Sequence, residues 1–243
     1  LIALRSNFKP IKSIKKAGFA GIIGSWGLFF AFSGGVYAIQ TTTVANAMFL
    51  FASAPFFAAL FGWFILRESV RKSTWIATLL AALGISVMVV DGFSAGYMVG
   101  NISALLSALG FAIFTIALRW GKLEDMLPAV FLAGLFTAIT SAIICYLGEF
   151  TVVLSINDAS IALAMGVFQV GAGLAIYTLG SKVVPAAELT LLSLTEVILG
   201  PLWVWIFIGE TVSFYTLIGG MILLMAIVGN ALTGLRRKPT PVI

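Results

Sequence analysis

Long apolar runs follow one another along nearly the whole chain, and short segments with glycine, proline or charged residues separate them. A helix that crosses a bilayer needs about 20 mainly apolar residues. Eight runs meet that length. They cover residues 17–39, 44–66, 73–93, 99–120, 126–148, 159–180, 186–209 and 212–235. Because the connections are short, consecutive helices are expected to be antiparallel neighbours. The pattern predicts an all-α integral membrane protein.

The composition supports a membrane location and excludes several functions. Of the 243 residues, 61% are hydrophobic and 9% are charged, whereas a soluble domain has about 25% charged residues. The sequence has no histidine, which excludes imidazole metal ligands and a Ser-His-Asp triad. The single cysteine, Cys145, allows no internal disulfide. No ATP-binding Gly-x-x-x-x-Gly-Lys-Ser/Thr motif and no intramembrane acid pair occur. We therefore expect no enzyme, no cofactor and no metal.

The basic residues predict how the chain is oriented in the membrane. All 14 Lys and Arg residues fall in the N-terminal stretch, in the second, fourth and sixth connections, or in the C-terminal tail. The alternate connections carry the acidic residues Asp91, Glu149, Asp158 and Glu210. By the positive-inside rule, both ends of this chain are expected to be cytoplasmic. The sequence thus predicts a multi-pass protein of the cytoplasmic (inner) cell membrane. Because the basic residues do not cluster on one face, nucleic-acid binding is not expected.

An internal repeat appears when the chain is shifted by 142 positions. The shift aligns the first three apolar runs with the last three. The matched pairs are Leu50 with Leu192, Leu60 with Leu202, Trp63 with Trp205, Glu68 with Glu210, Val70 with Val212, Thr74 with Thr216 and Ile76 with Ile218. The shared Trp-x-x-x-x-Glu at the end of a helix is the part least easily explained by chance.

The two copies are predicted to cross the membrane in opposite senses, because Glu68 falls on the cytoplasmic side and Glu210 on the other. Inverted repeats are a recurrent architecture of secondary transporters, with the substrate near the midplane. The shift spans five helices, which predicts two inverted five-helix repeats. We expect residues 1–96 to hold the three C-terminal helices of the first repeat, and 97–243 to hold all five of the second with a basic cytoplasmic tail. The first two helices are expected before Leu1.

The repeat segments resemble the EamA-type repeats of the drug/metabolite transporter superfamily. The segments are ANAMFLFASAPFFAALFGWFILRESV from Ala45 and AAELTLLSLTEVILGPLWVWIFIGETV from Ala186. Each has a small-residue start, a mid-helix Pro or Glu, an aromatic-rich half and a terminal Glu. The resemblance implies a ten-helix bundle of two inverted halves, of which eight helices are present here, and the transport of small metabolites or drugs, often outward.

Glu196 is the most informative polar residue, because it lies near the centre of the seventh span. A charged acid at the bilayer centre costs at least about 2.5 kcal/mol and commonly marks a substrate or proton path. Glu196 is therefore a candidate for binding a cationic substrate group or for exchanging a proton. The alternative is a protonated carboxyl that only hydrogen-bonds a neighbouring helix. The family often has Glu-Pro here, and this chain has Glu196-Val197.

The other candidates are polar, aromatic or proline residues within the spans. The further substrate-binding candidates are Gln169, Trp26, Asn46 and Glu188. Gln169 has the alternative of a helix–helix hydrogen bond, and Glu188 that of an interfacial position paired with Lys182. Trp26 is preferred as a residue that stacks on a planar ligand, because Tyr37 and Tyr177 fit interfacial anchors. Pro55 and Pro201 each remove a backbone hydrogen bond and are expected to kink their helices or to allow gating movements.

Glycine and serine predict where helices approach closely. Ser103 and Ser107 share one helical face with Gly110, and Gly166, Gly171 and Gly173 fall within the sixth span. Small residues of this kind allow the backbones of membrane helices to come together. We expect tight packing at both places.

Taken together, these features predict a secondary transporter that exports small metabolites, amino acids or drugs by alternating access. The expected partners are a small-molecule substrate and membrane lipids, and a homodimer is left open. The alternative is a truncated or non-transporting membrane subunit of the same fold.

Overall fold

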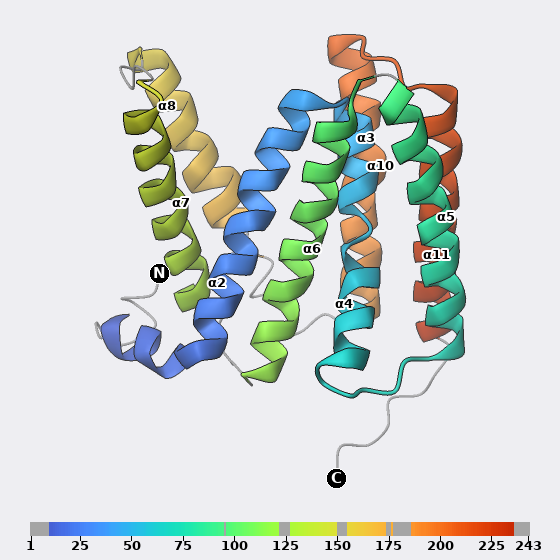
Figure 1. Cartoon of the computed structure of the whole chain (residues 1–243), viewed down its shortest axis with the longest axis horizontal. Coiled ribbons are helices and arrows are strands. Elements are labelled where there is room, and N and C mark those ends of the chain that lie inside the picture. Colours follow the sequence, from blue (N-terminus) through green and yellow to red (C-terminus); the bar gives the residue numbers. More distant parts are fainter. Residues whose placement is uncertain are drawn as a thin grey trace.

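The computed structural model describes residues 10–94, 96–121, 127–149, 155–173, 176 and 186–235. Within these residues the chain is a bundle of helices without strands (Figure 1). The helices are α2 Pro10–Thr41, α3 Val44–Phe51, α4 Ala54–Phe64, α5 Lys72–Ser94, α6 Met98–Trp120, α7 Leu127–Leu147, α8 Ile156–Ala164, the π-helix η1 Met165–Ala172, α10 Ala186–Ile208 and α11 Phe214–Leu235. The prediction of an all-α protein is confirmed.

All eight predicted apolar runs contain helix in the described part of the chain. Among the described residues, six helical segments are long and apolar enough to cross a membrane. They are Gly18–Thr41, Val44–Phe64, Lys72–Gly92, Met98–Ala117, Pro128–Leu147 and Phe214–Gly234. Two shorter apolar segments, Ile156–Ala172 and Glu196–Ile208, fall in the sixth and seventh runs. Helix is the structure that such sequences adopt in lipid, because it satisfies every backbone polar group within the segment.

Helices α2 and α6 cross with backbone against backbone. A Cβ atom at Gly110 would lie 2.5 Å from the carbonyl oxygen of Gly27, and one at Gly27 would lie 2.7 Å from that of Gly110. One turn away, the Ser107 hydroxyl donates a hydrogen bond of 2.5 Å to the Ala31 carbonyl. Small residues let the two helices approach this closely, which gives packing and hydrogen-bond energy in place of a hydrophobic driving force. The tight packing predicted at Ser107 and Gly110 is confirmed.

Helices α5 and α11 form a second close pair. A Cβ atom at Gly84 would lie 2.6 Å from the Gly219 carbonyl oxygen, and one at Gly219 would lie 2.5 Å from that of Gly84. The fully buried side chains of Leu50, Met88 and Leu223 belong to the core cluster that α3, α5 and α11 share beside this crossing. Since α5 and α11 are equivalent under the 142-residue shift, their pairing sets one half of the chain against the other.

Side-chain hydrogen bonds join the two ends of the α5–α11 pair. At one end, Thr74 Oγ1 and Arg71 Nη2 donate to Asn230 Oδ1 at 2.9 and 3.3 Å. At the other end, Thr216 Oγ1 donates to Asp91 Oδ2 at 3.3 Å. Thr74 and Thr216 occupy the same position in the repeat, 142 residues apart. The two halves therefore use an equivalent threonine to join opposite ends of one helix pair.

The turns that follow α4 and α10 are also equivalent. The chain leaves α4 through Arg67, with φ of 53°, and leaves α10 through Gly209, with φ of 74°. These positions are 142 residues apart. In Figure 1 the α4–α5 connection lies at the lower end of the bundle and the α10–α11 connection at the upper end. Glu68 and Glu210 follow these turns and so lie at opposite ends, the arrangement expected of inverted repeats.

The sixth predicted span departs from a regular α-helix. Its helix α8 continues directly into the π-helix η1, a rare form with a wider turn. The close approach expected at its glycines is wrong for the described residues, because nothing lies within 4 Å of a Cβ built at Gly166 or Gly173. Apart from the half-buried Ala172, the side chains of α8 and η1 are exposed. No described helix packs extensively on them, so these glycines meet no partner.

The glycine crossings lead to a stability prediction. Gly110→Ala places a methyl group against a backbone oxygen of α2, so we expect a loss of about 1–3 kcal/mol, the usual cost of overpacking. Gly134→Ala in α7 is the matched control, since nothing lies within 4 Å of its Cβ position and alanine favours helix. Thermal unfolding of the detergent-solubilised protein should show a lower Tm for Gly110→Ala alone. Equal Tm values for the two variants would contradict the crossing.

Candidate functional site

The start of α3 directs a polar side chain into the bundle. The chain turns between α2 and α3, and Thr43 Oγ1 caps α3 by accepting a hydrogen bond of 3.2 Å from the backbone N–H of Asn46. Helix α3 ends at Phe51, and α4 begins at Ala54 with Pro55 in its first turn. Proline is tolerated there because the first N–H groups of a helix lack helical partners. The capped first turn places Asn46 inside the bundle at 2% exposure.

Asn46 lies in a group of four buried polar side chains. This group, named the polar cluster, consists of Thr42, Asn46, Asn101 and Thr216. Thr42 Oγ1 donates to Asn101 Oδ1 at 2.9 Å. Asn46 Nδ2 donates to Thr42 Oγ1 at 3.1 Å and also to Asn101 Oδ1. Thr216 Oγ1 lies 3.5 Å from Asn46 Oδ1. No member is more than 8% exposed. Neutral hydrogen bonds join α3 to α6, and the cluster reaches α11 through the one hydroxyl proton of Thr216, which lies between Asn46 Oδ1 and Asp91 Oδ2.

Asp91 extends the polar cluster to the start of α11. Its Oδ2 accepts hydrogen bonds from Thr216 Oγ1, at 3.3 Å, and from Ser213 Oγ. Ser213 Oγ in turn accepts from the Thr216 backbone N–H at 3.0 Å. Asp91 was expected in a connection, but it lies in the last turns of α5. A carboxylate near the N-terminus of α11 is electrostatically favourable, which explains why this acid is kept within the helix.

The polar cluster leaves one buried donor without a partner. Asn101 is fully buried, and its Nδ2 makes no hydrogen bond to any described residue. The atom packs directly against Gly92, where a larger residue would collide with it. A buried donor without an acceptor costs about 1–3 kcal/mol. A movement of α5 or α6 that gave this group an acceptor would recover that energy.

Glu196 lies on the helix that packs against α3. A Cβ at Gly200 of α10 would lie 2.6 Å from the Met48 side chain of α3, and Val197 packs on the core cluster. Glu196 itself is exposed, and it makes no hydrogen bond or ion pair with a described residue. The helix thus docks on α3 through Val197 and Gly200 and leaves the carboxylate uncovered by the described chain.

The other candidate residues are not gathered in one place. Trp26 of α2 stacks on Phe136 of α7, with ring centroids 4.9 Å apart and an interplanar angle of 24°. Gln169 is exposed on η1. Pro201 lies inside α10, which runs without interruption from Ala186 to Ile208. Glu188 belongs to the same helix, and its side chain is outside the described residues.

Sequence reasoning missed three members of the polar cluster as site residues, Thr42, Asn101 and Thr216. Asn101 is an amide within an apolar run, so the criterion that selected Gln169 would also have selected it. Thr216 was recognised only as a repeat position paired with Thr74. Its partner Asn46 is 170 residues away in the chain, and no local pattern reports such a contact.

Comparison with known proteins places the chain among membrane transporters. It matches the EamA-like transporter family over residues 1–90 and 98–232. It is 24% identical over 229 residues to human solute carrier family 35 member G1, covering 87% of this chain and 60% of that protein. It is 26% identical over 198 residues to the pseudopaline exporter CntI of Pseudomonas aeruginosa, covering 81% of this chain and 69% of that protein.

One further relative is also named a transporter, and one solved structure shares the fold. The uncharacterized transporter YwfM of Bacillus subtilis is 27% identical over 180 residues, covering 72% of this chain and 60% of that protein. A protein of known crystal structure shares the fold, with a TM-score of 0.58 at 19% identity over 93% of this chain and 87% of its own. The chain therefore spans about 60–69% of the length of these curated relatives.

The membrane-length helices and the family match over both halves of the chain agree with each other. The chain belongs to the EamA-like transporter family.

Proposed function

We propose that the complete protein is a secondary transporter that exports a small metabolite, amino acid or drug across the cytoplasmic membrane by alternating access. Membership of a transporter family supports this proposal, as do relatives named as a pseudopaline exporter and a solute carrier. The proposed orientation has both ends of this chain in the cytoplasm, supported by the basic residues of the α4–α5 connection and the two ends.

The observation that carries the proposal is the unpaired carboxylate of Glu196 in α10. An acid in an apolar helix costs at least about 2.5 kcal/mol in the membrane, and no described cation compensates it. Packing does not require it, because Val197 and Gly200 make the contacts to the neighbouring helices. We assign Glu196 the binding of a cationic substrate group or the exchange of a proton during transport.

The polar cluster is proposed to seal the non-cytoplasmic end of the transport path. Alternating access requires a seal at one end that forms and breaks in each cycle. The cluster joins α3 to α6 through neutral hydrogen bonds, each with a net contribution of about 1 kcal/mol, and it reaches α11 through the Thr216 hydroxyl. Such bonds are weak enough to exchange as α3 and α11 move apart, and the unpaired Asn101 donor favours an alternative arrangement.

We further propose that residues 1–96 and 97–243 belong to two inverted repeats, and that the complete protein adds two helices to the first. Helix α2 packs against α6 and α7, whereas α8 and η1, its equivalent under the shift, are exposed. Glu68 pairs with Arg119 of α6, whereas the equivalent Glu210 keeps a buried Oε1 without a described partner. A helix pair on α8 and η1 would complete both sets of contacts, and the greater length of the relatives supports it.

A transport assay with Glu196→Gln tests the proposal. The full-length protein is reconstituted in proteoliposomes, and uptake of ethidium and of radiolabelled amino acids is measured from pH 6 to 8. The variant removes the charge with little change of size, so we expect uptake at least about tenfold slower, the effect of about 1.4 kcal/mol. The pH dependence of uptake should also be lost.

Glu149→Gln is the matched control, because it makes the same change at an exposed residue just after α7. It should leave uptake unaltered. If Glu196→Gln retains the rate and pH profile of the wild type, Glu196 has no role in substrate or proton binding. If neither the wild type nor the Glu149→Gln control takes up any of the probes, the result would favour the alternative, a non-transporting membrane subunit.

A further inference from the structure

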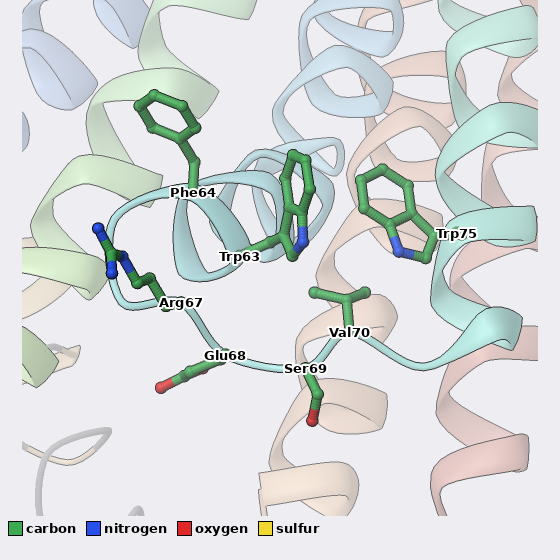
Figure 2. Close-up of a pocket in the computed structure, with 7 residues that line it drawn as sticks. All are labelled: Trp63, Phe64, Arg67, Glu68, Ser69, Val70 and Trp75. Carbon is green, nitrogen blue, oxygen red and sulfur yellow. The ribbon is translucent and has the colours of Figure 1, made fainter.

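A pocket opens at the end of the bundle opposite the polar cluster. It has a volume of about 500 Å³, within the range of small-molecule sites, and lies along the α4–α5 connection. Figure 2 shows Trp63 and Trp75 standing next to each other, with Arg67 extending from the loop on the side of Phe64. The pocket thus combines an aromatic wall with a cation at one end of the bundle.

The backbone of Arg67 shows that an arginine here has an energetic cost. Its φ of 53° is in the left-handed region, which costs a residue with a Cβ roughly 1–2 kcal/mol and glycine almost nothing. The second repeat makes the same turn with Gly209, at φ of 74°. The first repeat therefore has an arginine at a position where glycine would adopt the backbone conformation without strain. Backbone strain of this kind is typical of functional positions.

The charge balance of the pocket favours an anion. The Glu68 carboxylate is neutralised by Arg119, whose Nη2 lies 2.7 and 2.8 Å from its two oxygens. Arg71 donates to Asn230 on α11. The Arg67 guanidinium makes no hydrogen bond or ion pair with a described residue. Among the residues that line the pocket, Arg67 therefore keeps a positive charge without a described counter-ion.

The aromatic residues of the pocket are of the type found at a membrane–water boundary. The rings of Trp63 and Trp75 meet edge to face, with centroids 5.4 Å apart and an interplanar angle of 83°. Phe64 is 79% exposed, so it faces the surroundings of the bundle. Tryptophan is enriched at this boundary because its ring is apolar and its N–H is polar. The apolar side chains suit an acyl or glycerol group, and Arg67 suits a phosphate.

We propose that this pocket binds the headgroup of an anionic phospholipid, with Arg67 contacting the phosphate and Trp63 and Trp75 packing on the glycerol and upper acyl chains. This inference does not depend on the transport proposal.

The second repeat offers an internal comparison, because it lacks two of these features. It keeps Trp205 and Val212 at the positions of Trp63 and Val70, but it has Gly209 in place of Arg67 and Leu217 in place of Trp75. The site is therefore confined to one end of the bundle. This is the end with the basic residues, which matches a leaflet rich in anionic lipid.

Thermal-shift titration of the purified protein in uncharged detergent tests the proposal. Phosphatidylglycerol should raise the apparent Tm in a saturable way, because a ligand of the folded state stabilises it. Phosphatidylcholine and soluble glycerol phosphate should raise it far less. Arg67→Gly should increase the half-saturating phosphatidylglycerol concentration about fivefold, the effect of about 1 kcal/mol per basic residue. Trp75→Leu should also increase it.

The variants are chosen so that folding is preserved. Arg67→Gly and Trp75→Leu introduce the residues of the second repeat, and glycine relieves the left-handed backbone. Lys72→Ala is the control, since it removes a charge at the same end but outside the pocket. An unchanged half-saturating concentration in Arg67→Gly, or an equal increase in Lys72→Ala, would overturn the site. An equal Tm rise with phosphatidylcholine or with glycerol phosphate would overturn an anionic lipid as the ligand.

Discussion

Contact between backbones at two glycine crossings is the constraint on which the arrangement of this bundle depends. Lipid tails are as apolar as the helix surfaces, so burial of apolar side chains does little to hold membrane helices together. Gly27 with Gly110 and Gly84 with Gly219 instead bring helix axes close enough for extensive van der Waals contact. The first crossing joins α2 to α6, and the second joins equivalent helices of the two repeats. The positions of α3 and α10 follow from these pairs, because both pack beside α11.

The two halves have equivalent helices and turns but differ in the polar side chains that these carry. The functional proposals rest on these differences. Equivalent threonines join the opposite ends of α5 and α11, yet one bonds to Asn230 and the other to Asp91. Equivalent turns carry Arg67 in one half and Gly209 in the other. Equivalent positions of the two halves therefore share backbone structure but carry different polar groups.

The helices could be predicted from the sequence because a span in lipid must be helical and must contain about 20 apolar residues. The crossing at Gly110 was predicted from small residues on one face, but its partner Gly27 was not, because a helical pattern does not report which helix lies opposite. The same reasoning was wrong at Gly166 and Gly173, where no described helix approaches. Small residues permit close contact without requiring it.

The candidate site could be predicted only in part. Asn46 was selected from its place in the repeat, and the structure shows it within a buried hydrogen-bonded cluster. Asn101 could have been selected as an amide within an apolar run, but not its contact with Asn46, which joins residues 55 positions apart. The ion pair of Glu68 and Arg119 is also long-range. The left-handed conformation of Arg67 becomes foreseeable only when the shift aligns it with Gly209.

Labelling of introduced cysteines tests the inverted arrangement of the two halves most directly. Ser69→Cys and Thr211→Cys are single changes at exposed, equivalent positions of the two turns, made in a Cys145→Ala background. With intact cells, a membrane-impermeant maleimide should label the Thr211 position, whereas the Ser69 position should react only after the membrane is opened. Labelling of both positions from the same side would contradict opposite threading of the repeats and the transporter mechanism built on it.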